Sequence, residues 1–209
     1  MESTKIRSKS WTREKILSSA TEAFAAAGYH ATSMDDIVRL SGTSKGAIYF
    51  HFPGKEALFF SLIHRLADIV ESSAINAMAN NKGAVNTVDA VLHALFSLIT
   101  KHRELAKAVI VGGAGLEPSL NQELTNLHER FAFFIKLQLD QAIVEKSINP
   151  IDTTIASYCW LGAINEIITR YLTTGQAHQL EESLPHIRNL LLKSVALTPH
   201  PDRHLDTLH

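Results

Sequence analysis

Residues 33–58 read SMDDIVRLSGTSKGAIYFHFPGKEAL, and this stretch decides the fold. Ser33 can accept a hydrogen bond from the backbone N–H of Asp36, and the acidic side chains that follow lie at the positive end of a helix. Gly42 ends this helix, because the residue after a helix often takes the left-handed conformation that glycine adopts without strain. The stretch therefore begins with a short, well-capped helix.

A second helix begins almost at once, because Thr43 or Ser44 can cap it. Two capped helices separated by so few residues cannot be collinear, so they cross at a steep angle. This is the geometry of a helix-turn-helix, which sets its second helix into the major groove of DNA. Upstream, residues 11–28 carry apolar residues at helical spacing and are predicted to form the first helix of a three-helix module.

The same stretch resembles the TetR family of bacterial transcriptional regulators. The residues that match the family pattern occur in order and without a gap: Ile37, Gly42, Ser44, Gly46, Ile48, Tyr49, His51, Phe52, Lys55, Glu56 and Leu58. The chain departs from the pattern at Val38, Ser41 and Thr43, where the family usually has Ala, Ala and Val. The hydroxyl groups at positions 41 and 43 predict slightly looser packing between the two short helices.

The residues expected to contact DNA lie on and around the second helix. Lys45, Gly46 and Ala47 occupy its first turn, where a lysine can donate to guanine and a glycine allows close approach. Donors suited to phosphate oxygens, which the resemblance also implies, are Ser33, Ser44, Tyr49, His51 and Lys55. The alternative for the two lysines is an ordinary solvated surface charge.

Charge is distributed unevenly along the chain. Its 209 residues carry a formal net charge of −1, but residues 1–56 hold eight Lys or Arg against six Asp or Glu. This asymmetry indicates that DNA binds near the N-terminus. We expect a flexible tail at 1–9 and a DNA-binding domain at 10–56, with the motif at about 33–52.

The rest of the chain is predicted to be all-α as well, with an effector-binding and dimerisation domain at 57–198 and a flexible tail at 199–209. A hydrophobic content of 45% is ample for a core. Apolar spacing predicts helices at about 56–80, 84–102, 103–111, from Pro118 onward, 152–174 and 181–197. The predicted fold is thus a small three-helix module joined to a larger helical domain.

Residues 152–174 carry more apolar surface than one core-facing stripe needs, so a second face requires a second partner. The resemblance implies that the helices at about 152–174 and 181–197 pair with their copies in a four-helix bundle. A homodimer of this kind would read a near-palindromic operator. The alternative is that the extra apolar face is covered within the chain.

The resemblance also implies a cavity among the middle helices for a small-molecule effector, which releases a repressor from DNA. The apolar candidates favour a hydrophobic effector. The lining candidates are His93, Phe96, His128, Phe131, Phe134, Tyr158, Trp160, Asn165 and Glu166. The alternative is that the aromatic side chains are ordinary core and that the histidines are hydrogen-bonded scaffolding.

Other classes of protein lack their motifs. Eleven histidines include no HExxH pair and no clustered metal ligands, and neither a Gly-x-Ser-x-Gly elbow nor a phosphate loop occurs. We therefore expect no enzymatic activity, no cofactor and no metal. The single cysteine, Cys159, excludes an intrachain disulfide, and no signal peptide or spanning segment is evident, so a cytoplasmic location is expected. The competing function is a helical small-molecule-binding protein without a DNA role.

Overall fold

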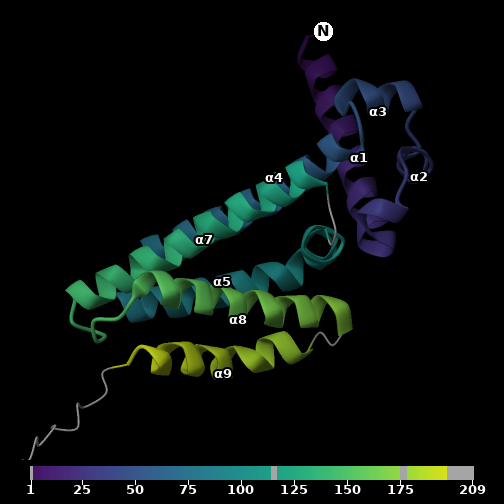
Figure 1. Cartoon of the computed structure of the whole chain (residues 1–209). Coiled ribbons are helices and arrows are strands. Elements are labelled where there is room, and N and C mark those ends of the chain that lie inside the picture. Colours follow the sequence, from purple (N-terminus) through teal and green to yellow (C-terminus); the bar gives the residue numbers. More distant parts are fainter. Residues whose placement is uncertain (1, 114–116, 175–177, 197–209) are drawn as a thin grey trace, which may run out of the picture.

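A computed structural model describes residues 2–113, 117–174 and 178–196. Within these ranges the regular structure is helical and includes no strand, so the all-α prediction is confirmed. Figure 1 shows the first three helices gathered at one end of the molecule and the remaining helices extending away from them. We call these parts the head and the body.

The head consists of α1 (Glu2–Ala31), α2 (Met34–Ser41) and α3 (Lys45–His51). Its small core takes fully buried side chains from all three helices, including Phe24, Ile37 and Ile48. Apolar residues on α1 recur at helical spacing, and this stripe faces the two shorter helices. Burial of the stripe explains how three short helices hold one arrangement.

The structure differs from the flexible N-terminal tail predicted for residues 1–9, because α1 already begins at Glu2. The physical reason is composition: neither Gly nor Pro precedes Gly28, and Glu, Lys and Arg are good helix formers. Regular helix ends at Gly28, where φ is 82°, as the sequence predicted. The predicted tail at 199–209 lies outside the described residues.

The body begins with α4, which leaves the head and runs alongside α7, while α5 and α8 pack beside them and α9 packs on α5 and α8 (Figure 1). Its elements are α4 (Lys55–Ala79), α5 (Ala84–Lys101), α6 (Arg103–Ala106), the π-helical turn η1 (Lys107–Val111), α7 (Pro118–Val144), α8 (Thr153–Thr174) and α9 (His178–Ser194). Most bounds agree with the predicted ranges. Two details differ: the segment predicted at 103–111 changes from α- to π-helix, and α9 starts at His178.

Helices α4 and α7 are connected along their length by hydrogen bonds and ion pairs between polar side chains. The contacts join Glu56 to Ser119 at 2.5 Å, His64 to Glu123 at 3.6 Å, and Glu71 to Arg130 at 2.5 Å. Residue numbers rise together in these pairs, so the two helices run parallel. These polar contacts hold α4, the helix that enters the head, against the body.

A second connection between head and body is made by η1, which packs against α1. The backbone N–H of Tyr29 donates to the carbonyl of Gly112 at 3.1 Å, and the buried Tyr29 ring packs on Phe24 and Phe59. A Cβ added to Gly112 would lie 2.5 Å from the carbonyl oxygen of Ala108. We call the contact between Tyr29 and Gly112 the joint.

Electrostatics at the joint follow from burial. The pKa of Tyr29 is raised to about 12, mainly because the ring is buried. The second cause is the negative charge of Glu117, which accepts a hydrogen bond from the Tyr29 hydroxyl. Glu117 immediately precedes α7, so Tyr29 connects the end of α1 to two separate segments of the body. The tyrosine is therefore a neutral hydrogen-bond donor at ordinary pH.

The Gly112→Ala substitution tests the joint. The new Cβ would lie 2.5 Å from the carbonyl oxygen of Ala108 within η1 and 3.1 Å from that of Phe24 in α1. The last turn of η1 must therefore distort and also move away from α1. We expect the free energy of unfolding, measured by urea denaturation, to fall by about 1–3 kcal/mol. Gly54→Ala is the matched control, because no atom lies within 4 Å of its Cβ position. Equal effects of the two substitutions would contradict the close packing.

Candidate functional site

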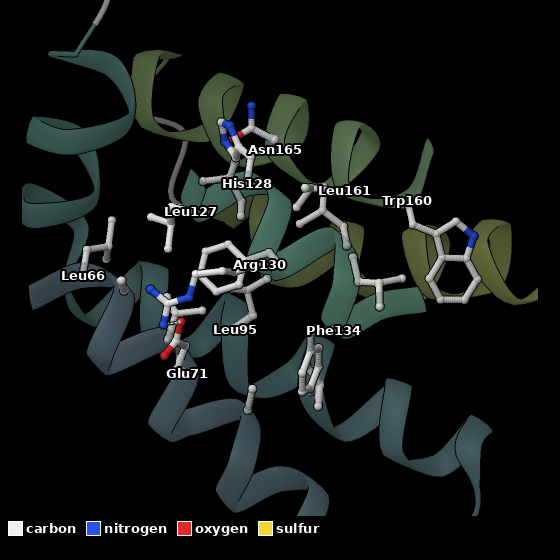
Figure 2. Close-up of a pocket in the computed structure, with 18 of the residues that line it drawn as sticks. Leu66, Glu71, Leu95, Leu127, His128, Arg130, Phe134, Trp160, Leu161 and Asn165 are labelled. Carbon is white, nitrogen blue, oxygen red and sulfur yellow. Dashed lines mark ion pairs between the residues drawn. The ribbon is translucent and has the colours of Figure 1, made fainter. Parts of the chain in front are cut away.

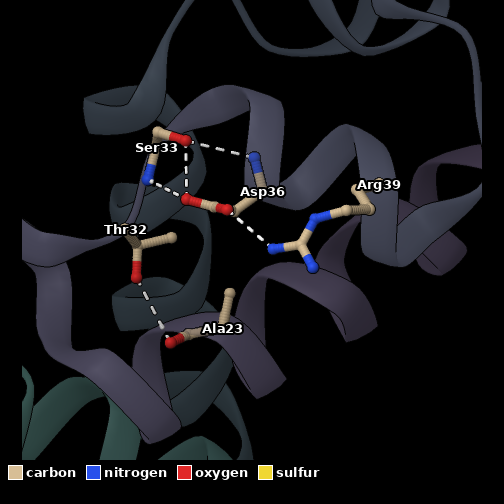
Figure 3. A network of polar contacts seen from close by, with 5 residues as sticks. All are labelled: Ala23, Thr32, Ser33, Asp36 and Arg39. Carbon is tan, nitrogen blue, oxygen red and sulfur yellow. Dashed lines mark hydrogen bonds and ion pairs between the residues drawn. The ribbon is translucent and has the colours of Figure 1, made fainter.

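A network of hydrogen bonds fixes the start of α2 (Figure 3). The backbone N–H of Asp36 donates to Ser33 Oγ at 3.1 Å, and the backbone N–H of Ser33 donates to Asp36 Oδ2 at 3.0 Å. Arg39 Nη2 holds the other carboxylate oxygen at 2.8 Å. The Ser33 hydrogen bonds, followed by that from Arg39, lower the pKa of Asp36 to about 2. The predicted Ser33 cap is confirmed.

The loop before α2 is anchored to α1 as well. Thr32 Oγ1 is buried and lies within hydrogen-bond distance of two carbonyl oxygens, at 3.2 Å from that of Ala23 and 2.8 Å from that of Gly28 (Figure 3). Because the loop is tied to α1 and the first turn of α2 is capped, the orientation of α2 on the head is fixed from both sides.

The turn between α2 and α3 has the predicted left-handed glycine, with Gly42 at φ 59°. The hydroxyl groups of Ser41 and Thr43, where the chain departs from the TetR pattern, share a hydrogen bond of 2.7 Å. Ser41 is buried, and its hydroxyl also lies 3.2 Å from the Val38 carbonyl oxygen. The two hydroxyls thus satisfy each other within the turn.

Helix α3 presents a surface on which most of the predicted contact residues lie together. Ser44 caps it by accepting a hydrogen bond of 3.2 Å from the backbone N–H of Ala47. Exposed side chains or backbone occur at Ser44, Lys45, Gly46 and Tyr49, whereas Ala47 and His51 are half-buried. No atom lies within 4 Å of a Cβ built on Gly46, so the backbone there is open to close approach.

Lys45, Ser33 and Lys55, which are among the predicted contact residues, donate hydrogen bonds within the chain. Lys45 Nζ donates to Asp35 Oδ1 at 2.8 Å, which raises the pKa of the lysine. The Ser33 hydroxyl donates to Asp36 at 2.6 Å. Lys55 Nζ donates to the Tyr29 carbonyl at 2.8 Å and lies over the Tyr29 ring, so it holds the start of α4 to the end of α1.

Phe50 lies on the same surface and was not among the sequence candidates. Its side chain is 67% exposed, and its ring lies edge-on to that of His51. The sequence contained a signal for this position, because the buried residues Ile48 and Phe52 are four apart and leave position 50 on the outer face. An exposed aromatic ring is unusual enough to add Phe50 to the candidate surface.

The body encloses a cavity of about 560 Å³ between α4, α5, η1, α7 and α8. Its walls are mainly Leu, Ile, Val and Phe side chains, as Figure 2 shows. Five sequence candidates line it: His128, Phe131, Phe134, Trp160 and Asn165. A volume of this size suits a small organic ligand.

Four other candidates do not line the cavity. His93 is exposed on α5, and Phe96 is buried in the core. Tyr158 lies on the outer face of α8, where its hydroxyl donates to Glu129 at 3.0 Å, and Glu166 pairs with Arg170 there. The physical reason is that helical spacing defines the faces of a helix but not the element that each face meets.

The turn η1 lines the cavity and also lies next to the head. Val109 and Ile110 of η1 line the cavity, and Gly112 directly after η1 forms the joint with Tyr29. Leu66 and Val70 of α4, the helix that continues from the head, also line the cavity. A change in the volume of the cavity therefore bears on both connections to the head.

Comparison with known proteins agrees with this geometry. Residues 16–62 match the family described as bacterial regulatory proteins, tetR family. The regulator LmrA of Bacillus subtilis is 31% identical over 112 residues, which are 53% of this chain and 59% of LmrA. The uncharacterised regulator YxaF of the same organism is 30% identical over 152 residues, 69% of this chain and 79% of YxaF.

The chain belongs to the TetR family. It is a DNA-binding transcriptional regulator, because that is the function shared by these helix-turn-helix relatives. The solved structure of FadR from Bacillus subtilis in complex with stearoyl-CoA has the same fold, with a TM-score of 0.78 at 21% identity. The superposition covers 87% of this TetR-family chain and 98% of FadR.

Among the side chains that the structure describes, no group of three His, Cys, Asp or Glu is placed to hold a metal ion. In the same part of the chain, every helix is too short or too polar to cross a bilayer.

The network at Asp36 predicts how stability changes in acid. The pKa of Asp36 is lowered to about 2, so the network stabilises the fold above pH ~4, the unfolded value, and this contribution is lost as pH falls toward 2. Asp36→Asn removes the group that titrates. We expect the difference in unfolding free energy between wild type and variant to shrink from pH ~6 to pH ~2.5.

The control is Asp68→Asn, which changes an exposed carboxylate on α4 outside this network. Urea denaturation at both pH values measures the difference. A gap between wild type and Asp36→Asn that stays constant with pH would contradict the lowered pKa.

Proposed function

We propose that this TetR-family regulator is a repressor that binds a near-palindromic operator as a homodimer and is released by a hydrophobic small molecule. The observation that carries the proposal is the position of η1, which lines the cavity with Val109 and Ile110 and contacts the head through Gly112. An occupant of the cavity therefore has a direct mechanical route to the DNA-binding surface.

On DNA, the first turn of α3 reads base edges through Lys45, Gly46 and Ala47. Ser44, Tyr49 and His51 contact phosphates, and Phe50 offers its ring for apolar contact with sugars or thymine methyl groups. The side chains of Ser33, Lys45 and Lys55 already donate within the chain, so each must give up its partner or use another N–H group to reach DNA. The Ser33 hydroxyl must leave Asp36, whereas the Lys55 ammonium has three N–H groups and two carbonyl neighbours, at 2.8 and 3.4 Å.

The division into a DNA-binding domain at 10–56 and a second domain at 57–198 is part of this proposal. The division is supported by the separate core of the head, although α4 starts at Lys55 and continues through the body. Because one helix belongs to both parts, the boundary transmits movement and is not a free linker.

The homodimer is supported by apolar side chains left on the outside of α8 and α9. Ile155 is 59% and Leu190 66% exposed, and Tyr158, Cys159 and Gly162 extend the same outer face of α8. An exposed apolar face of this kind suits a two-fold interface in which each helix meets its copy. Two α3 helices about 34 Å apart would then read successive turns of the operator.

The hydrophobic effector is supported by the apolar walls of the cavity and by FadR, a protein of the same fold whose structure contains stearoyl-CoA. Filling the cavity moves α4 and η1, and the two heads of the dimer no longer match the spacing of the operator. The alternative of a helical small-molecule-binding protein without a DNA role is disfavoured by membership of a family of DNA-binding regulators.

Selection of bound sites from random-sequence duplex DNA, followed by a salt titration, tests this function. We expect an enriched near-palindrome whose affinity falls steeply with salt, because Lys and Arg contacts release counterions from phosphates. Adding an apolar effector should lower the affinity for the selected site. Enrichment of a single half-site would contradict the dimer, and no enrichment at all would contradict the operator-binding role.

The ion pair between Asp35 and Lys45 gives a prediction on affinity. Asp35→Asn frees Lys45 and removes a negative charge from the candidate surface, so affinity for the selected operator should rise about three- to tenfold at low salt. Lys45→Gln should lower it and should weaken discrimination at one base pair by about 1–3 kcal/mol. Fluorescence anisotropy with matched and mutated duplexes measures both. Unchanged affinity in both variants would remove Lys45 from the reading surface.

The proposed interface predicts a change in oligomeric state. Leu190→Glu places a charge on the outer face of α9, so sedimentation equilibrium should find a monomer in place of a dimer. Val144→Glu is the matched control, because Val144 is also exposed but lies at the end of α7. A Leu190→Glu protein that remains dimeric would contradict the interface.

A further inference from the structure

We propose that the effector is a single-chain amphiphile with an anionic head group, that Arg130 binds this head group, and that Glu71 occupies Arg130 until the effector arrives. The inference rests on the proposed function, because it concerns the same cavity. It specifies the charge of the ligand, the residue that recognises it and the contact that its binding breaks.

Charged side chains are rare in the lining of the cavity, where the other polar side chains include His128, Gln138, Asn165 and Thr169. Among the described residues that line it, Arg130 and Glu71 are the only Lys, Arg, Asp or Glu. The walls are otherwise formed mainly by apolar side chains, and burying an unpaired charge among them would cost far more than ligand binding can return. An ionised end of a ligand therefore finds a counter-charge where Arg130 and Glu71 lie, with its apolar chain among the other lining residues.

Arg130 and Glu71 lie at the mouth of the cavity. Their side chains are 56% and 32% exposed, and their ion pair of 2.5 Å connects α7 to α4. One turn further along these helices, Ile75 and Phe133 are largely exposed and yet line the cavity, so the cavity opens to solvent beside the pair. Figure 2 shows Glu71 and Arg130 facing each other, with Leu66 and Leu95 on either side of them in this view.

The geometry of the pair favours an anion as the incoming group. An arginine fork can bind a carboxylate or phosphate through two parallel hydrogen bonds. The more exposed partner is the arginine, and an exposed ion pair is weak enough to be exchanged. His128 and Asn165 also line the cavity and add N–H donors. A cationic head group would find one carboxylate, that of Glu71.

Exchange at Arg130 has a consequence for the head. Of the three polar contacts between α4 and α7, the one between Glu71 and Arg130 lies farthest along α4 from the head. When the head group takes Arg130, Glu71 becomes hydrated and the far part of α4 loses its polar contact with α7. The same binding event thus satisfies the ligand charge and loosens the helix that enters the head.

The test measures binding of three ligands with the same chain and different ends: dodecanoate, dodecanol and dodecyltrimethylammonium. Displacement of a polarity-sensitive fluorescent probe from the full-length protein measures the binding of each ligand, with the two ionic ligands below their micelle concentrations and dodecanol below its solubility limit. Dodecanoyl-CoA is a fourth ligand, which distinguishes a carboxylate from the phosphates of a thioester as the source of the negative charge. We expect at least one of the two anionic ligands to bind about tenfold more tightly than dodecanol.

Variants assign the preference to the pair. Arg130→Gln should remove the preference for the anion and leave dodecanol binding unchanged. Glu71→Gln should tighten anion binding up to about fivefold, because it removes the competing carboxylate. Lys136→Gln is the matched control: Lys136 is an ion-paired cation on the same helix, but it does not line the cavity. It should leave all affinities as in wild type.

Two outcomes would overturn the inference and leave the hydrophobic effector in place. In one, the wild type binds the anionic ligands no more tightly than dodecanol, and Arg130→Gln behaves in the same way. In the other, the protein prefers the trimethylammonium compound, and this preference depends on Glu71. Failure of all four ligands to displace the probe would contradict the proposed hydrophobic effector itself. The two levels of failure are therefore distinguishable.

Discussion

The backbone contact between Tyr29 and Gly112 is the constraint on which the arrangement of head and body depends. It joins two segments by an N–H to carbonyl hydrogen bond of 3.1 Å, at a place where a glycine carbonyl approaches α1. The buried Tyr29 ring lies beside this contact, tilted against Phe24 and edge-on to Phe59. Residues of η1 line the cavity, and Gly112 directly after η1 supplies one side of the joint, so the joint and the cavity meet at this turn.

Elements whose signals are local could be predicted from the sequence. Ser33 caps α2 with Asp36, Gly42 ends it in the left-handed region, and Pro118 opens α7. Each of these depends on side chains and backbone groups within about four residues, so a short window of sequence contains the whole cause. The resemblance of the same window to one family then extended the prediction from helices to a DNA-binding function.

The rest depended on contacts between residues far apart in the chain. The spacing of His93 and Tyr158 was compatible with a cavity wall, yet one faces solvent and the other the outer side of α8. The ion pair of Glu71 with Arg130 had no sequence signal, because its partners are on different helices. The start of α1 was misjudged for another reason: helix propensity outweighed the apparent disorder of a short polar segment.

The length of α4 has a mechanical consequence. At 1.5 Å per residue, Glu71 lies about 24 Å from the start of the helix at Lys55, so α4 acts as a lever arm whose near end lies in the head. A tilt of only about 5° at this radius moves one end by about 2 Å relative to the other, whereas a binding constellation tolerates displacements of about 0.5 Å. In a two-fold pair both levers would swing in opposite directions, so the mismatch with a rigid duplex would be doubled.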